Sequence, residues 1–163
     1  MRYLMRKQLF SIGEDFWVED ERGERVMRVD GKVLRVRQTF VLEDASGAEL
    51  ATIRKKLLAV RDTMDIERGG QVVARVRKAL FAPFRQRFDV EVDGGPAVVV
   101  QGNITDHEYE VRRDSVRVAE ISKRWFSVRD TYAVDVAPGE DVAMILALTV
   151  AVDWMGHEER GDR

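Results

Sequence analysis

Hydrophobic and polar residues alternate along much of the first 137 residues, which is typical of half-buried antiparallel strands. Every second residue of Phe88–Asp93 is apolar, and Leu34–Arg37 repeats the pattern with its two arginines on the outward face. Short turn signals separate these runs: Glu21–Gly23, Asp30–Gly31, Ala45–Gly47, Gly69–Gly70, Asp93–Pro96, Gly102–Asn103 and Arg113–Asp114. They divide the chain into about a dozen strands, and no linker marks a second domain.

A weak internal repeat supports a meander of similar hairpins. Five apolar residues recur at spacings of 24, 23, 23 and 22 residues: Val29, Ile53, Val76, Val99 and Ile121. A lysine stands two residues after three of them, at Lys55, Lys78 and Lys123. We expect the five to occupy equivalent strand positions. Because any meander of similar hairpins drifts toward a common spacing, the repeat argues for architecture and not for activity.

The last part of the chain predicts one buried helix. Pro138–Gly139 breaks the final strand, Glu140 and Asp141 supply the negative charge that a helix N-terminus favours, and we expect Gly156 to end the helix. The resulting helix, Glu140–Met155, is apolar on every side through its middle. A helix without a polar face must be covered all round, and the sheet is the only available cover.

A twisted antiparallel sheet of this size tends to close, because closure removes its edges. A closed barrel of about twelve strands has an interior that needs a filler. The fold class that follows is mainly β, a closed antiparallel barrel around a central hydrophobic C-terminal helix. We expect residues 1–156 to form this single domain and residues 157–163 to form a polar tail.

Composition narrows the class of protein further. The chain has 163 residues, of which 45% are hydrophobic and 34% charged, with a net charge of −2, so wholesale disorder is excluded. It has no cysteine, which excludes thiol chemistry and suits a reducing compartment. Basic residues interrupt the apolar ones near the N-terminus, and no apolar run reaches the ~20 residues of a membrane span. We expect a cytoplasmic protein, with peripheral attachment to a membrane as a variant of that location.

Catalytic motifs are absent from the sequence. The only histidines are His107 and His157, and no metal-ligand spacing, nucleophile elbow or glycine-rich phosphate loop is present. His107 lies among Asp106, Glu108 and Tyr109, a group that could transfer protons or bind a metal, although a histidine hydrogen-bonded to a neighbouring turn residue is a much commoner arrangement. We therefore expect no enzyme activity, no cofactor and no metal.

Charge distribution gives the clearest candidate for function. Between Thr52 and Phe88 ten basic residues stand against three acidic ones, and arginine suits bidentate contacts with phosphate. We expect a basic barrel face that binds anionic phospholipid head groups or another phosphorylated ligand. Its candidate residues are Arg54, Lys55, Lys56, Arg77, Lys78, Arg85 and Arg87. The alternative is that these side chains are ordinary outward strand positions, neutralised by carboxylates of neighbouring hairpins.

Other partners are weighed by the same criteria. A pI of about 5.8 and the lack of a helix-turn-helix or RNP-like motif disfavour nucleic acid. Leu80–Phe84, between basic neighbours, is the best candidate for an exposed apolar loop that enters a membrane interface. The alternative function is a structural or protein-interaction scaffold whose loops contact a partner protein.

Four segments resemble the LURP-one-related family. They are Tyr3–Gln8, Asp106–Glu110, Ile121–Ser127 with Asp130–Tyr132, and the apolar helix that ends near Asp153. The resemblance implies the tubby C-terminal-like superfamily, with a twelve-stranded barrel around a central hydrophobic helix. It also implies distant relatives that bind phosphoinositide head groups or belong to the phospholipid scramblases. No tubby phosphoinositide signature maps onto this sequence, and the acylated cysteine cluster of scramblases has no counterpart in a chain without cysteine.

Overall fold

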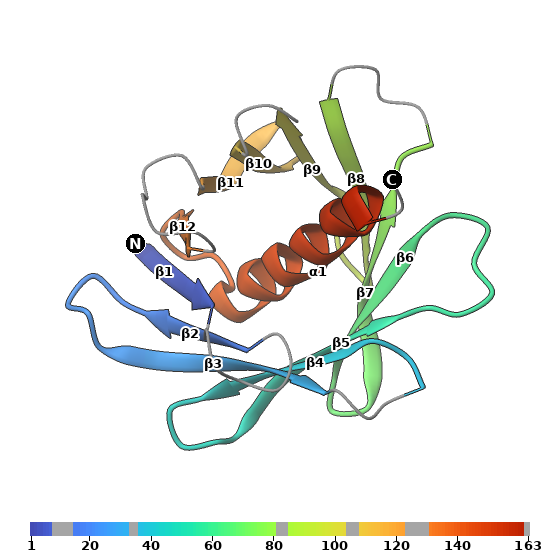
Figure 1. Cartoon of the computed structure of the whole chain (residues 1–163). Coiled ribbons are helices and arrows are strands. Elements are labelled where there is room, and N and C mark those ends of the chain that lie inside the picture. The colour runs from blue at the N-terminus through green and yellow to red at the C-terminus, as the bar shows by residue number, and fades with distance from the viewer. Residues whose placement is uncertain (8–14, 33–35, 81–84, 104–107, 123–130, 162–163) are drawn as a thin grey trace.

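The structure is a computed structural model that describes residues 1–7, 15–32, 36–80, 85–103, 108–122 and 131–161. Twelve strands precede a single helix, and the strands form a closed barrel in which each is antiparallel to its neighbours in sequence. The strands are β1 (Arg2–Lys7), β2 (Phe16–Glu19), β3 (Arg25–Lys32), β4 (Thr39–Asp44), β5 (Glu49–Lys55), β6 (Thr63–Arg68), β7 (Gln71–Lys78), β8 (Arg85–Val92), β9 (Val98–Asn103), β10 (Glu108–Arg113), β11 (Val116–Ser122) and β12 (Thr131–Val136). Pairing of β1 with β12 closes the ring, as Figure 1 shows.

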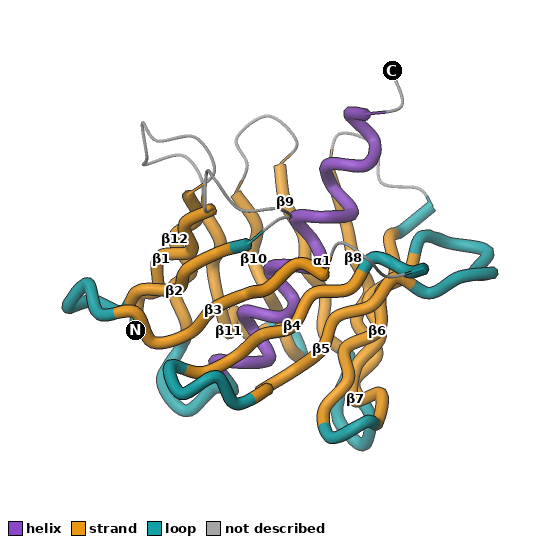
Figure 2. The backbone as a smooth tube through the Cα atoms, turned by 60° about the horizontal axis from the view of Figure 1, so that its bottom comes forward, coloured by secondary structure: helices purple, strands orange, loops and turns teal. Residues whose placement is uncertain are grey.

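Alternation along the strands separates an inner from an outer face. Leu42, Ile53, Ile66 and Val76 are fully buried on the inner face, and polar residues alternate with them. The helix α1 (Val142–Gly161) runs through the barrel and packs against β4–β7 and β12 (Figure 2). Its middle is buried on every side, so the predicted fold class and the role of the helix as filler are confirmed.

The bounds of the helix correct two expectations. Asp141, and not Glu140, precedes the first helical residue, and its Oδ1 accepts a hydrogen bond from the Met144 backbone N–H at 3.1 Å. The helix also continues through Gly156 to Gly161. Gly156 therefore lies within the helix beside the barrel wall, where a Cβ would make ordinary van der Waals contact with Gln86 Oε1 at 3.4 Å, and it does not end the helix.

Several predicted turns and strands are also corrected. Asp30–Gly31 and Gly102–Asn103 lie within β3 and β9 and are not turns. Within the predicted strand Leu34–Arg37, residues 34 and 35 lie outside the described part, and Val36 and Arg37 belong to the connection between β3 and β4. Val99 is partly exposed, and its neighbours Val98 and Val100 take the inner face, so the repeat is out of register at this member. Its other four members are buried as expected.

The two ends of the barrel are built differently. The turn end consists of the connections 20–24, 45–48, 69–70, 93–97, 114–115 and 137–141. At 114–115 both Asp114 and Ser115 have positive φ, of 48° and 66°, which fits a tight hairpin turn. The opposite end, where α1 finishes, is the loop end, and the described parts of its connections are residue 15, which is the buried Asp15, and residues 36–38, 56–62 and 79–80.

Candidate functional site

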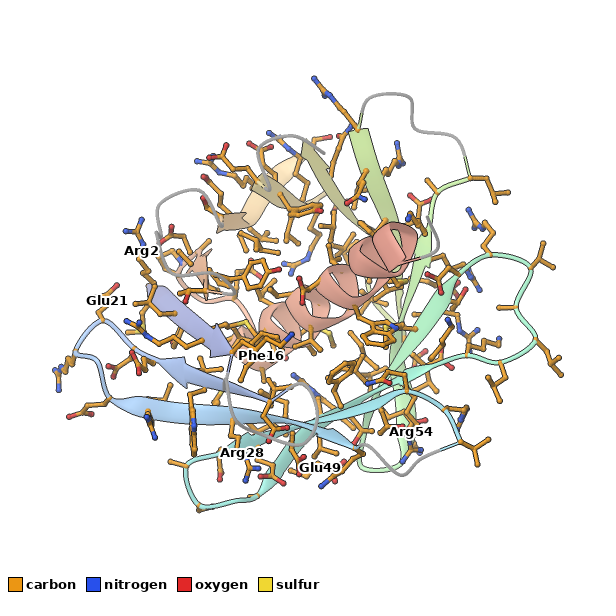
Figure 3. The ribbon with its side chains drawn as sticks, in the orientation of Figure 1. Arg2, Phe16, Glu21, Arg28, Glu49 and Arg54 are labelled. Carbon is orange, nitrogen blue, oxygen red and sulfur yellow. The ribbon has the colours of Figure 1, made fainter. Side chains whose placement is uncertain are left out.

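Three of the seven expected cations lie on the outer wall of the barrel and are ion-paired. They are Arg54 on β5, Arg77 on β7 and Arg87 on β8, and Figure 3 shows Arg54 on the outer side of its strand. In each case a guanidinium nitrogen lies within hydrogen-bonding distance of a carboxylate oxygen. The pairs are Arg54–Glu67 at 2.9 Å, Arg77–Glu91 at 3.0 Å and Arg87–Asp89 at 3.1 Å.

These pairs belong to a ladder of alternating charge across four strands. Carboxylates on β6 and β8 stand beside the arginines of β5 and β7, and the register places Arg75 opposite both Asp65 and Glu91. Arg75 Nε donates to Asp65 Oδ1 at 2.7 Å, and this hydrogen bond raises the pKa of Arg75 above its ordinary value. The outer wall is therefore neutralised strand by strand, and it leaves little field for an anion to sense.

The other four expected cations lie at the loop end. Lys55 and Lys78 finish β5 and β7 in the inward register of Ile53 and Val76. Lys56 begins the connection between β5 and β6, and Arg85 begins β8. Two of the three lysines that follow the repeated apolar position, Lys55 and Lys78, therefore mark the same end of successive hairpins, and the third, Lys123, lies outside the described residues.

A continuous arc of the loop end joins these residues, and we call it the basic rim: residues 36–38, 55–62, 78–80 and 85. Backbone hydrogen bonds link its segments, because Lys55 N–H donates to Gln38 O at 2.9 Å and Lys78 N–H donates to Asp62 O at 3.0 Å. The strands that carry the rim, β3 to β8, are neighbours in the sheet. Its basic residues are Arg37, Lys55, Lys56, Arg61, Lys78 and Arg85, against the single carboxylate Asp62.

Arg37 and Arg61 were not among the expected site residues. Each begins an Arg-x-Thr segment, and the threonine is buried at the start of the next strand. Thr39 Oγ1 donates to Arg37 O at 3.0 Å, and Thr63 Oγ1 donates to Arg61 O at 2.8 Å. The segments are 24 residues apart, which matches the internal repeat, so this spacing is the sequence signal that could have identified both arginines.

The rim differs from the outer wall in how its charges are satisfied. In the described part of the chain, no hydrogen bond or ion pair involves the side chains of Arg37, Lys56 or Arg85. Arg61 lies 3.9 Å from Asp89, a loose contact between two partly exposed groups. These cations are therefore available to an anion without the breaking of a close pair.

The turn end carries the opposite charge. With strand ends included, the rim holds six cations against one carboxylate, and on the same basis the turn end holds ten carboxylates against five arginines, with seven of these carboxylates and Arg22 lying in its connections. The acidic residues of the connections are Asp20, Glu21, Glu24, Asp93, Asp114, Glu140 and Asp141. Two of them are paired, Glu140 with Arg113 and Asp141 with Arg68, both at 2.6 Å. Among the described residues the barrel is thus polarised along its axis, with the positive pole at the rim.

A surface hollow of about 300 Å³ lies beside Arg85 on the outer wall. Glu108, Glu110 and Glu120 also line it, and their charge repels a free anion. This hollow therefore does not suit a small phosphorylated ligand.

The remaining expectations concern histidine chemistry, metals and membranes. His107 and residues 81–84 of the expected apolar loop lie outside the described residues, as does the His157 side chain. Over the described ranges, no group of three or more His, Cys, Asp or Glu residues is arranged to hold a metal ion. No helix in the same part of the chain has the length and hydropathy needed to cross a bilayer.

The family model described as LURP-one-related matches residues 1–153, which include every strand of the barrel. This protein belongs to the LURP-one-related family. The barrel is also similar to the X-ray structure of a protein from Arabidopsis thaliana, with a TM-score of 0.69 and 20% sequence identity over 94% of this chain and 91% of that chain. At this identity the likeness shows the fold alone. No curated protein matches the chain.

Membership of the LURP-one-related family confirms the resemblance that the sequence carried. The matched range includes the whole basic rim and α1 as far as Asp153. The binding role is argued below from the charges of this chain, because fold and family membership alone do not specify a ligand.

Proposed function

We propose that this LURP-one-related protein is a non-enzymatic module that binds anionic phospholipid surfaces through its basic rim. The observation that carries the proposal is the separation of charge along the barrel axis, with six cations at the rim and an acidic turn end. A cation near an anionic membrane contributes about 1 kcal/mol, so a few rim cations suffice for reversible attachment. Repulsion of the turn end favours an orientation with the rim toward the lipid.

The proposal moves the expected basic face from the outer wall to the loop end. A phosphate could contact the outer-wall arginines only if each gave up its close ion pair with a carboxylate. This applies to Arg54, Arg77 and Arg87, and exchanging one ion pair for another adds little binding free energy. Lys56 and Arg85 require no exchange and are the first residues to test. Lys55 and Lys78 lie close behind them at the same end and add to the field.

Vesicle flotation tests the proposal directly. The wild-type protein should float with phosphatidylcholine vesicles that contain phosphatidylserine and not with phosphatidylcholine alone, and binding should fall as salt rises. Lys56→Glu with Arg85→Glu should weaken binding more than tenfold, because each reversal replaces attraction of about 1 kcal/mol with repulsion. The matched control is Arg22→Glu, an exposed turn-end substitution that makes the same change in net charge as Lys56→Glu alone, and these two single variants are compared.

Two outcomes would contradict this function. Equal flotation with and without phosphatidylserine would show that the anionic head group is not recognised. If the control variant Arg22→Glu loses as much vesicle binding as the rim variant Lys56→Glu, the effect comes from net charge in general and not from the rim. Competition by inorganic phosphate at constant ionic strength distinguishes a lipid surface from a soluble phosphorylated ligand, because only a site for the free anion saturates. A stoichiometric protein partner, together with indifference to lipid, would favour the scaffold alternative.

A further inference from the structure

The tip of the connection between β5 and β6 exposes apolar side chains that nothing in the described structure covers. Leu58 and Val60 are fully exposed, at 105% and 98%, and Leu57 is half exposed. Figure 1 shows this connection extending away from the barrel beside the strand β6. It is unusual for three aliphatic side chains at one tip to remain in water, because burying any of them against an apolar surface would lower the free energy.

The backbone of the tip is held in a conformation that leucine disfavours. Leu58 has a φ of 60°, in the left-handed region that suits glycine or asparagine. The base of the connection is fixed by Lys56 N–H, which donates to Thr63 O at 2.9 Å, and by the buried Thr63 hydroxyl. An exposed leucine therefore occupies a position where glycine would adopt the same backbone conformation with less strain. Backbone strain of this kind is typical of functional positions.

Charge brackets the apolar tip on both sides. Lys55 and Lys56 precede Leu57, and Arg61 follows Val60, so cations surround an apolar centre within one short connection. Val36 and Leu80, both exposed, lie in the two flanking connections of the same rim. Apolar side chains surrounded by lysine and arginine match the layered chemistry of a membrane surface, with anionic head groups outside and acyl chains beneath.

We propose that Leu57, Leu58 and Val60 insert into the acyl boundary of an anionic phospholipid bilayer, while Lys56 and Arg61 contact its head groups. This inference rests on the proposed function and adds an apolar anchor to the electrostatic attachment. Head-group attraction alone is lost at high salt, whereas the inserted side chains retain part of the binding. The occupant of the tip is therefore lipid, and not a second copy of the chain or a protein partner.

The absence of cysteine from the sequence allows a direct test by single-site labelling. Leu58→Cys and, at the turn end, Val116→Cys are each labelled with an environment-sensitive fluorophore and mixed with phosphatidylcholine–phosphatidylserine vesicles. We expect a blue shift and quenching by acyl-chain-labelled lipid for the probe at position 58 only. Val116 is the matched control because it is also an exposed aliphatic residue, at 64%, at the opposite end.

Substitutions separate anchoring from folding. Leu57→Ser, Leu58→Ser and Val60→Ser together should reduce vesicle binding about tenfold or more, because full burial of one leucine is worth about that factor. Val72→Ser with Val116→Ser should leave it unchanged. Leu58→Gly should raise the thermal midpoint by relieving the left-handed strain and should still weaken binding. A purely structural role of Leu58 cannot produce these opposite changes.

The outcomes distinguish this inference from the function on which it rests. If the triple serine variant binds as the wild type does, while Lys56→Glu with Arg85→Glu loses binding, insertion is wrong and electrostatic attachment stands. If the wild-type protein binds no anionic vesicle, the proposed function fails and the anchor with it. If the probe at position 58 shifts without vesicles and the protein sediments as a dimer, the tip contacts protein and the inference is overturned.

Discussion

The packing around Gly102 leaves no room for a side chain larger than a hydrogen atom. It lies in β9 opposite Tyr109 of β10, and the tyrosine ring covers it. A Cβ at residue 102 would lie 2.2 Å from Tyr109 Cδ1 and 2.7 Å from the Glu108 carbonyl oxygen. The ring cannot retreat easily, because its hydroxyl donates to Gln86 Oε1 at 2.5 Å inside the barrel. Glycine is required here by close approach and not by a turn.

We expect Gly102→Ala to destabilise the protein by about 1–3 kcal/mol, the usual cost of overpacking. Chemical denaturation of the single variant, of Tyr109→Ala and of the double variant measures this value and its origin. Because the clash is with the ring, the double variant should lose less than the sum of the single losses. Strict additivity would show that contact with the Glu108 carbonyl, and not with the ring, sets the cost.

The sequence pattern around Gly102 illustrates what single residues can and cannot predict. Gly102–Asn103 and Asp30–Gly31 have the composition of turns, yet both lie within strands. A glycine supplies either a positive φ or room for a neighbour, and the sequence does not say which because the neighbour is far along the chain. At Gly69–Gly70, by contrast, both φ values are positive and the predicted turn is confirmed.

The start of α1 shows how one side chain serves a whole element. The Asp141 carboxylate accepts a hydrogen bond from the Met144 N–H at 3.1 Å and receives two from Arg68, at 2.6 and 2.9 Å. The hydrogen bond from Arg68 lowers the pKa of Asp141 below its ordinary value of 3.8. The carboxylate thus caps the helix and fixes its N-terminal end to β6.

Asp141→Ala should lower the free energy of unfolding by about 1 kcal/mol through loss of the cap, whereas Asp141→Asn should lose less because asparagine also caps. A carboxyl group whose pKa is lowered on folding stabilises the folded state above its unfolded pKa, and this contribution disappears as pH falls through the folded pKa. The difference between wild type and Asp141→Asn should therefore be present at pH 7, begin to fall as the pH approaches 3.8, and be lost only when the pH falls through the lower pKa of the folded state. Urea denaturation across this pH range measures it.

Because half of the Asp141 side chain is exposed, the ionic part of this difference should not exceed about 1 kcal/mol. An equal loss in the alanine and asparagine variants at pH 7 would mean that the ion pair with Arg68, and not the cap, holds the helix start. A difference that persists in acid would show that charge is not involved.

Elements were predictable to the extent that their signal is local. Alternation identified the strands, and the run from Ile145 to Val152 identified a helix that must be enclosed. The predicted helix end was wrong because a glycine can end a helix or lie within one, and the local sequence does not say which. The exposed tip was missed for a similar reason, since an apolar run such as Leu57–Val60 reads as buried strand unless the positions of its neighbours are known.

At the scale of the whole molecule, the direction of the chain sorts charge between the two ends. In an antiparallel meander every second connection lies at the same end, so a feature repeated once per hairpin accumulates there. Two of the repeated lysines, Lys55 and Lys78, and the Arg-x-Thr segments at Arg37 and Arg61 follow this rule and lie in the basic rim, whereas Lys123 lies outside the described residues. The sequence contained the spacing, but which cations stay unpaired depends on the register between strands, and only the structure supplies it.

Enclosure of α1 makes the barrel and the helix one cooperative unit. Leu146, Leu148, Val150 and Met155 are buried, and each is worth about 2 kcal/mol, so helix burial rivals the whole stability of a typical domain. A chain that ends at Pro138 should therefore bind hydrophobic dyes, aggregate and lack a cooperative thermal transition. A chain that ends at Gly156 is the matched control, because it keeps every one of these side chains. It should unfold in a single thermal transition with a midpoint close to that of the full chain, and calorimetry compares the two.

A soluble, cooperatively unfolding barrel from the shorter chain would show that the ring of strands folds stably without the enclosed helix. Failure of the longer chain would place essential contacts in residues 157–163.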